Sequence, residues 1–136
     1  MDSKSINIIF ACDHAAYNQK IIIEKYLIQH LKDVNIHDVG CNNTNSCDYP
    51  DFAKLAFNKY IELNKKALII VLCSTGIGIS ISMNRHDIDC CLVHNELEVE
   101  NAVNKLQAKS IALGGNILGQ ELLNNLCLKF IKLSFI

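Results

Sequence analysis

A glycine-containing segment follows an apolar run of the chain and could bind an anion. Residues 67–72 (ALIIVL) are continuously apolar, and residues 73–80 (CSTGIGIS) come directly after them. Gly76 and Gly78 would let the backbone approach a ligand closely. A helix that begins there offers unpaired N–H groups and the positive end of its dipole. We expect a phosphate or oxyanion site here, although a glycine turn needed only for tight strand–helix packing would leave the same pattern.

Cys73 stands immediately before this expected anion site. A thiolate is expected beside a helix N-terminus, and proton abstraction next to a carbonyl requires a base beside an oxyanion hole. The spacing therefore suits an aldose–ketose isomerisation, and it suits a cysteine nucleophile equally well. The segment lacks the Lys of a Walker A loop, and Ile81 stands where the dinucleotide-binding pattern has its third glycine.

A second pair of polar residues follows another apolar run. Asp13 and His14 come after residues 6–11 (INIIFA) and Cys12. An acid beside an imidazole at the exit of a strand can hold hydroxyls, a phosphate or a proton in transit. Asp13 can equally be a cap of the following helix, with His14 a polar loop residue. The sequence leaves both interpretations of this pair open.

Strand and helix patterns alternate along the chain and must position these residues. Strands are predicted over residues 6–11, 34–39, 67–72, 88–93 and 110–113. Helices are predicted over residues 17–31 (with Tyr17, Ile21, Ile28 and Leu31 among the apolar positions), from Pro50 through Tyr60, from the glycine turn to about Asn84, after a capping box of Asn95 and Glu98, and over about 118–133. Residues 40–49 are predicted to be a polar loop.

This alternation predicts an α/β fold for residues 1–136 as a single domain. Short connections favour a five-stranded parallel Rossmann-like sheet with helices on both faces, which is a three-layer α/β/α sandwich. In such sheets the ligand crevice lies beyond the carboxyl ends of the strands. Asp13 and Cys73 are predicted to lie at those ends.

Composition narrows the classes of partner. The chain has 136 residues, of which half are hydrophobic, and a net charge of −1. This charge argues against a broad electrostatic grip on nucleic acid. The sequence shows no signal peptide and no apolar run near the roughly 20 residues that span a bilayer, so we expect a cytoplasmic protein without a membrane partner. The seven cysteines form no usual zinc pattern and are mostly expected to be small apolar residues.

Four segments together resemble ribose-5-phosphate isomerase B and its galactose-6-phosphate isomerase relatives. They are residues 12–15 (CDHA), 48–51 (DYPD), 73–80 (CSTGIGIS) with Asn84 following, and 111–115 (IALGG). Their order and spacing match the family over residues 6–133. Each motif is weak alone, but four in register are specific, and the chain is identified as a member of this family.

The resemblance implies a role for most of these residues. Cys73 would be the general base that moves a proton between C1 and C2 of a small sugar phosphate. Thr75 and Asp13 would assist ring opening and hold sugar hydroxyls, and His14 and Tyr49 would contact the substrate. The backbone N–H groups of residues 76–80 would hold the enediolate oxygen. The substrate-binding residues so implied are His14, Tyr49, Ser74, Gly76, Ile77, Gly78, Ser80, Lys105 and Asn116.

The resemblance also implies a homodimer with shared active sites and no metal or organic cofactor. Residues 105–109 (KLQAK) replace a His- and Asn-containing segment of the family, and Asn116 stands where an Arg is usual. Phosphate-binding arginines of the family would lie beyond Ile136. Lys105 or Lys109 could supply a replacement charge, or both could be solvated residues at a helix end. The alternative function is a catalytically impaired member that binds a sugar phosphate or a protein partner.

Overall fold

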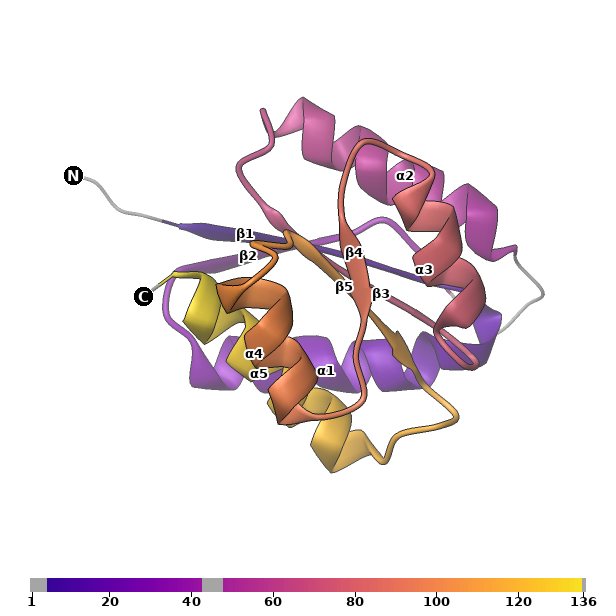
Figure 1. Cartoon of the computed structure of the whole chain (residues 1–136). Coiled ribbons are helices and arrows are strands. Elements are labelled where there is room, and N and C mark those ends of the chain that lie inside the picture. The colour runs from indigo at the N-terminus through magenta and orange to yellow at the C-terminus, as the bar shows by residue number, and fades with distance from the viewer. Residues whose placement is uncertain (1–4, 43–47, 136) are drawn as a thin grey trace.

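The computed structural model describes residues 5–42 and 48–135. Its strands form one parallel sheet in the order β2-β1-β3-β5-β4 (Figure 1). The strands are β1 (Ile6–Cys12), β2 (Val34–Asp38), β3 (Leu68–Cys73), β4 (Cys90–Leu92) and β5 (Ser110–Gly114). The helices are the short 3₁₀ helix η1 (His14–Ala16), α1 (Tyr17–His30), α2 (Tyr49–Glu62), α3 (Ile77–Asn84), α4 (Glu96–Asn104) and α5 (Gln120–Ser134). The predicted loop over residues 40–49 lies partly outside the described residues.

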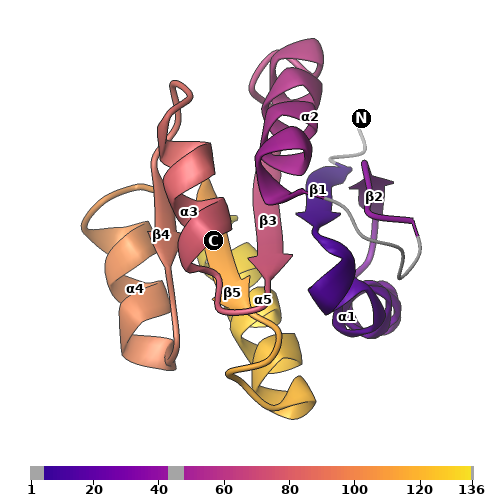
Figure 2. The ribbon, with the colours of Figure 1, turned by 90° about the vertical axis from the view of Figure 1, so that its right-hand side faces the viewer.

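The sheet separates two helical layers. Helices α1, α4 and α5 cover one face, and α2 and α3 cover the other (Figures 1 and 2). Strand β3 is buried along its whole length, because alternate side chains of a central parallel strand enter both layers. The predicted three-layer α/β/α architecture with a five-stranded parallel sheet is confirmed.

The buried stripe of α1 differs from the prediction. Ile28 is 58% exposed, whereas Lys20, Ile23 and Leu27 are buried. Positions 20, 23 and 27 follow helical spacing, but a lysine interrupts the apolar pattern that would have marked this face. In α5, Leu122, Leu123, Leu126, Phe130 and Ile131 are the residues that the helical pattern predicts to face inward. Leu122 is only partly buried against the core, and the other four are buried.

Strand β4 is shorter than the predicted segment 88–93. It covers Cys90–Leu92, and the side chain of Asn84 pairs with the backbone at its start. Asn84 Nδ2 donates to the Cys90 carbonyl at 2.7 Å, and the Cys90 N–H donates to Asn84 Oδ1 at 3.0 Å. A side chain at the end of α3 therefore replaces ladder bonds that a strand neighbour would otherwise make.

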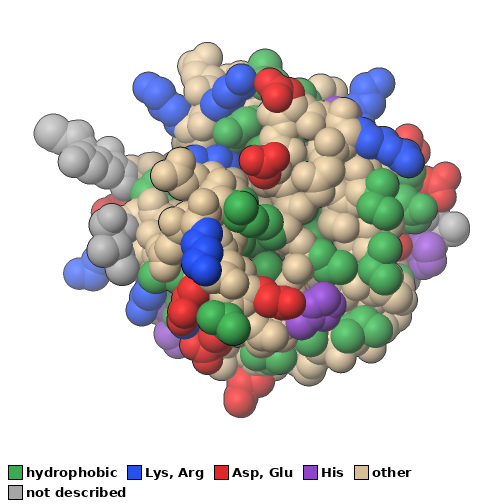
Figure 3. Space-filling model, in the orientation of Figure 1, with side chains coloured by type: hydrophobic (Ala, Val, Ile, Leu, Met, Phe, Trp, Pro, Cys, Tyr) green, Lys and Arg blue, Asp and Glu red, His purple; other side chains and the backbone are tan. Residues whose placement is uncertain are grey.

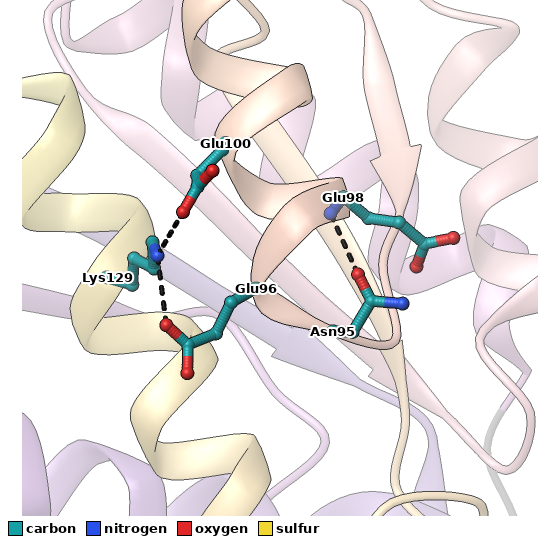
Figure 4. A network of polar contacts seen from close by, with 5 residues as sticks. All are labelled: Asn95, Glu96, Glu98, Glu100 and Lys129. Carbon is teal, nitrogen blue, oxygen red and sulfur yellow. Dashed lines mark hydrogen bonds and ion pairs between the residues drawn. The ribbon is translucent and has the colours of Figure 1, made fainter.

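The N-terminus of α4 is capped as predicted on one side. Asn95 Oδ1 accepts from the Glu98 N–H at 2.9 Å. Glu98 Oε1 in turn accepts from the N–H of His94, one residue before the cap, at 2.6 Å. Lys129 of α5 then donates to Glu96 and Glu100 at 2.9 and 2.6 Å and fastens α5 to α4 (Figure 4).

Residues 5–42 and 48–135 contain neither a candidate membrane span nor a cluster of metal ligands. None of the helices in these ranges is long and apolar enough to cross a membrane. Within the same ranges, no three His, Cys, Asp or Glu side chains gather as ligands of a metal ion would.

Candidate active site

Strands β1 and β3 lie side by side, and the chain leaves them toward opposite faces of the sheet. Helix α1 follows β1 on one face, and α3 follows β3 on the other (Figure 2). Such a switch point is where open α/β sheets bind ligands. Cys12 is paired with Leu72, and the Asp13 N–H donates to the Leu72 carbonyl at 3.2 Å. Asp13 and Cys73 therefore leave neighbouring strands at the same level.

Asp13 caps η1 and is buried. Its Oδ1 accepts from the Ala15 N–H at 3.0 Å. Burial raises the pKa of the Asp13 carboxyl, against the opposing effects of the Ala15 N–H and of His14 nearby. Both interpretations of Asp13 thus find support, because a cap with a raised pKa is also suited to exchanging a proton. His14 is exposed at the first position of η1.

The sulfur of Cys73 lies at the N-terminal end of α3. Cys73 is 4% exposed, and its Sγ accepts from the Gly76 N–H at 3.1 Å. Its carbonyl accepts from the Gly115 N–H at 2.8 Å, so the exit of β5 supports the exit of β3. These two bonds fix both the backbone and the side chain of Cys73.

Gly76 is required by the conformation and packing of this turn. Its φ is +82°, and a Cβ atom there would lie 2.6 Å from Leu92 Cδ1 and 2.8 Å from the carbonyl carbon of Leu113. An L side chain would be strained in this conformation and would have no room. The turn therefore requires a glycine for its conformation and packing, and the predicted anion site beside it stays a prediction.

Some of the N–H groups predicted to form the oxyanion site already donate to acceptors within the chain. The N–H groups of Gly76, Ile77 and Ser80 donate to Cys73 Sγ, to Thr75 Oγ1 at 3.3 Å and to the Gly76 carbonyl at 3.1 Å. Among the described residues, the N–H groups of Gly78 and Ile79 have no acceptor. First-turn N–H groups lack a partner inside their own helix. Two of the five predicted donors thus have no acceptor within the described chain, and of these two residues Ile79 is fully buried whereas Gly78 is partly exposed.

Tyr49 covers this first turn of α3 from the neighbouring helix. It is the first residue of α2, and a Cβ atom at Gly78 would lie 2.7 Å from Tyr49 Cζ. The absence of a side chain at Gly78 therefore lets the phenol ring rest on the helix backbone. The phenol stands near the open N–H groups, as expected of a residue that contacts the same ligand.

Ser74, Thr75 and Asn116 surround the turn, whereas Ser80 faces away from solvent. Asn116 Nδ2 donates to Ser74 Oγ at 3.0 Å, and its backbone N–H donates to the Ser74 carbonyl at 2.9 Å. Thr75 and Ile77 are exposed. Ser80 is buried, and its hydroxyl donates to the Ile77 carbonyl at 2.8 Å. This bond argues against the predicted direct contact of Ser80 with substrate.

Within one chain, Lys105 lies at the amino ends of the strands, opposite to the carboxyl ends that carry Asp13 and Cys73. It ends α4, which runs from the carboxyl end of β4 back toward the start of β5. The neighbouring Lys109 carbonyl accepts from the Ile69 N–H near the start of β3. The structure therefore does not bring Lys105 to Cys73 within one chain. Its predicted role requires a second copy and stays a prediction.

Sequence reasoning missed Lys20. This lysine is fully buried behind the exit of β1 and donates to Asp38 Oδ1 and to the Cys41 carbonyl. The available signal was its place on the helical stripe with Ile23 and Leu27, because a lysine in such a stripe must find partners inside the protein.

Comparisons with known proteins agree on one family. The family model described as Ribose/Galactose Isomerase matches residues 8–136. A Rickettsia conorii protein that carries the provisional name of sugar phosphate isomerase is 40% identical over 134 residues, covering 97% of this chain and 90% of that protein. The LacB subunit of galactose-6-phosphate isomerase from Clostridium acetobutylicum is 33% identical over 129 residues, covering 94% of this chain and 73% of that protein.

A solved structure extends the comparison to the fold. Ribose-5-phosphate isomerase B from Mycoplasma genitalium, determined with bound ribulose-5-phosphate, is similar with a TM-score of 0.86. Its sequence is 30% identical, and the match covers 96% of this chain and 86% of that one. Sequence and fold therefore agree over nearly the whole length.

Proposed function

The chain belongs to the ribose/galactose isomerase family, and from this premise we propose that it interconverts ribose 5-phosphate and ribulose 5-phosphate. The observation that carries the proposal is the position of the Cys73 sulfur. It lies at the N-terminus of α3, beside the exit of β1 that carries Asp13 and at the same helix turn as the Gly78 N–H, which has no acceptor within the described chain. A base and a preorganised oxyanion site are the two parts that an enediolate mechanism needs.

In the proposed reaction Cys73 acts as a thiolate base on the open-chain sugar. It removes the proton from C2, and the electron pair of that C–H bond forms the C1–C2 double bond while the aldehyde oxygen becomes the enediolate oxygen. The positive end of the α3 dipole and the partly exposed N–H of Gly78 stabilise this charge. The O2 proton passes to O1 as the ketone forms at C2, and the Cys73 thiol returns its proton to C1.

Residues around the base would prepare the substrate. The raised pKa of Asp13 supports a role in passing a proton during ring opening, together with the exposed hydroxyl of Thr75. His14 and Tyr49 would hold sugar hydroxyls. A pentose phosphate is proposed because the similar Mycoplasma genitalium structure holds ribulose-5-phosphate. The Clostridium acetobutylicum relative, a galactose-6-phosphate isomerase subunit, supplies the competing hexose substrate.

We propose a homodimer in which a second copy of the chain covers the exposed side of α3 and the segment after β5. Ile77 and Ile81 are half-exposed one turn apart on α3, and Ile117 is half-exposed after β5. Figure 3 shows hydrophobic side chains reaching the surface on the side of α3. Burial of these side chains would favour association. A partner could also bring a lysine such as Lys105 to the phosphate.

A second candidate function rests on Asn116 and residues 105–109. The Asn116 side chain is bonded to Ser74 of its own chain, and no His is present in residues 105–109. These features favour a member that binds a sugar phosphate without turning it over. Binding of ribose 5-phosphate by a folded protein that shows no isomerisation would establish this alternative.

The test is turnover by the purified protein with ribose 5-phosphate and with galactose 6-phosphate. We expect isomerisation of the pentose phosphate, faster than that of the hexose phosphate. Cys73→Ala should lower kcat roughly 10²- to 10⁴-fold. Cys91→Ala, a change of the half-buried thiol in β4, is the matched control and should retain turnover. A folded, dimeric wild-type protein without turnover would refute the isomerase proposal.

A further inference from the structure

Lys20 is the one cation with a fully buried side chain among residues 5–42 and 48–135. It lies in the first turn of α1, and its Nζ has two oxygen partners. It donates to Asp38 Oδ1 at 2.5 Å and to the Cys41 carbonyl at 2.8 Å, and it lies 5.6 Å from the centre of the Tyr17 ring. Removing an ammonium group from water costs several kcal/mol unless such partners replace its hydration.

The partners of Lys20 belong to the connection that leaves β2. Asp38 is the last residue of β2, and its Oδ1 also accepts from the Gly40 N–H at 2.9 Å. Lys20 therefore binds this connection twice, once through the Asp38 carboxylate and once through the Cys41 carbonyl. The same connection leads on to α2, which begins at Tyr49.

The connection is also joined to the exit of β1. The Cys12 N–H donates to the Gly40 carbonyl at 2.7 Å, and the Cys41 N–H donates to the Cys12 carbonyl at 2.8 Å. Burial raises the pKa of the Cys12 thiol to about 11, while the nearby Lys20 ammonium opposes that rise. The Lys20 ammonium is thus connected through Cys41 to Cys12, the last residue of β1 and the one before Asp13.

A purely structural explanation accounts poorly for a charge at this position. An apolar side chain of similar length would fill the space on the buried stripe of Ile23 and Leu27, and replacing buried ion pairs by apolar residues is often neutral or stabilising. What an apolar residue cannot do is hold the Cys41 carbonyl and the Asp38 carboxylate at fixed positions. A gain in positioning is therefore the better explanation of the buried charge.

We propose that Lys20 is a positioning residue of the active site. It ties residues 38–41 to the exit of β1 and so sets Asp13 relative to Cys73. Lys20 does not touch the substrate in this account. The proposal rests on the isomerase function proposed above as far as its effect on turnover is concerned, whereas the tether itself can be measured without turnover.

The test compares Lys20→Met with the double variant Lys20→Met/Asp38→Asn. In the single variant the Asp38 carboxylate loses its partner, so we expect lower thermal stability. In the double variant both members of the Lys20–Asp38 ion pair are neutral and stability should recover, but the Cys41 carbonyl still lacks its donor. Lys25→Met, at an exposed position of the same helix, is the matched control and should behave as the wild type.

Two readouts decide the proposal. Hydrogen–deuterium exchange of the bonded amides of residues 39–41 should be about tenfold faster in both Lys20 variants, and kcat/KM should fall roughly 10- to 100-fold in both. Recovery of kcat/KM together with stability in the double variant would overturn the proposal in favour of a merely structural role. Unchanged exchange would overturn the tether. A wild-type protein without turnover would refute the proposed function, while the exchange data would still decide the tether.

Discussion

The ring of Tyr49 lies directly on Gly78. A Cβ atom at Gly78 would come within 2.7 Å of Tyr49 Cζ and 2.9 Å of Cε1, closer than any pair of unbonded carbon atoms tolerates. Gly78 is therefore the surface on which the phenol rests. The N–H of Gly78 has no acceptor within the described chain, so in the proposed site the same residue would donate to the ligand and also support the Tyr49 ring.

Gly78→Ala should displace Tyr49 and weaken substrate binding. The added methyl group forces the ring away from the first turn of α3, where a helical alanine is otherwise well accommodated. We expect KM for ribose 5-phosphate to rise roughly tenfold or more, with thermal stability close to that of the wild type. Gly119→Ala, where an added Cβ meets nothing within 4 Å, should leave both quantities unchanged. An unchanged KM in Gly78→Ala would show that Tyr49 does not contact the substrate.

Asn116→Ala tests whether this residue acts on the substrate or through Ser74. The substitution removes the bond from Nδ2 to Ser74 Oγ but leaves the backbone bond to the Ser74 carbonyl. We expect kcat/KM to fall roughly three- to tenfold, as the loss of one neutral hydrogen bond predicts. Ser74→Ala measured alone and combined with Asn116→Ala provides a double-mutant cycle. Additive effects would contradict coupling through Ser74.

Much of the candidate site could be predicted from the chain because its residues follow strands directly. Asp13 and Cys73 each come after an apolar run, and a parallel sheet necessarily brings the ends of its strands to one edge. The oxyanion donors could be predicted only as a range. Which N–H groups remain open depends on the bonds of Gly76, Ile77 and Ser80, and these bonds arise from side-chain positions that no local pattern fixes.

The parts that escaped prediction depend on contacts between distant segments. Lys20 was not recognised as buried because its partners, Asp38 and Cys41, lie about 20 residues further along the chain. The exposure of Ile28 has the same origin, since the rotation of α1 on the sheet follows from packing against α5 and β1 rather than from its own apolar pattern. Helical spacing defines possible faces, and tertiary contacts choose between them.

Glu24 should make the stability of the protein depend on pH. Burial, followed by the hydrogen bond to Asp38 and the Asp38 charge, raises the pKa of Glu24 from 4.5 to about 8 in spite of an opposing effect of Lys20. The unfolded chain loses this proton near its ordinary pKa, whereas the folded protein keeps it up to about 8. Between these values the folded state binds more protons, so the free energy of unfolding falls as pH rises.

Glu24→Gln removes the titratable carboxyl and replaces it with an amide of similar size that can still form hydrogen bonds. We expect its free energy of unfolding, measured with urea at pH 5 and at pH 8, to decline less between the two values than that of the wild type. Because groups distant from Glu24 titrate equally in both proteins, the difference reports on Glu24 and its neighbours Asp38 and Lys20. Parallel curves for the two proteins would contradict a raised pKa at Glu24.

Asn84→Ala should loosen β4. The substitution leaves the N–H and carbonyl of the buried Cys90 without the partners they have now, and it also removes the bond from Nδ2 to the Ser80 carbonyl. We expect a loss of about 1–3 kcal/mol in the free energy of unfolding, measured with urea. Asn104→Ala, at an exposed position at the end of α4, should cost much less. Equal losses in the two variants would assign no special role to Asn84.

The central claim is that Cys73 moves a proton between C1 and C2, and isomerisation in D₂O tests it most directly. Mass and NMR spectra of ribulose 5-phosphate formed from ribose 5-phosphate would show whether deuterium has entered C1. We predict deuterium at C1 with the wild-type protein, because a thiol can exchange its proton with solvent before returning it, and loss of both turnover and incorporation in Cys73→Ala. Undiminished turnover and incorporation in Cys73→Ala would contradict the assignment of Cys73 as the base.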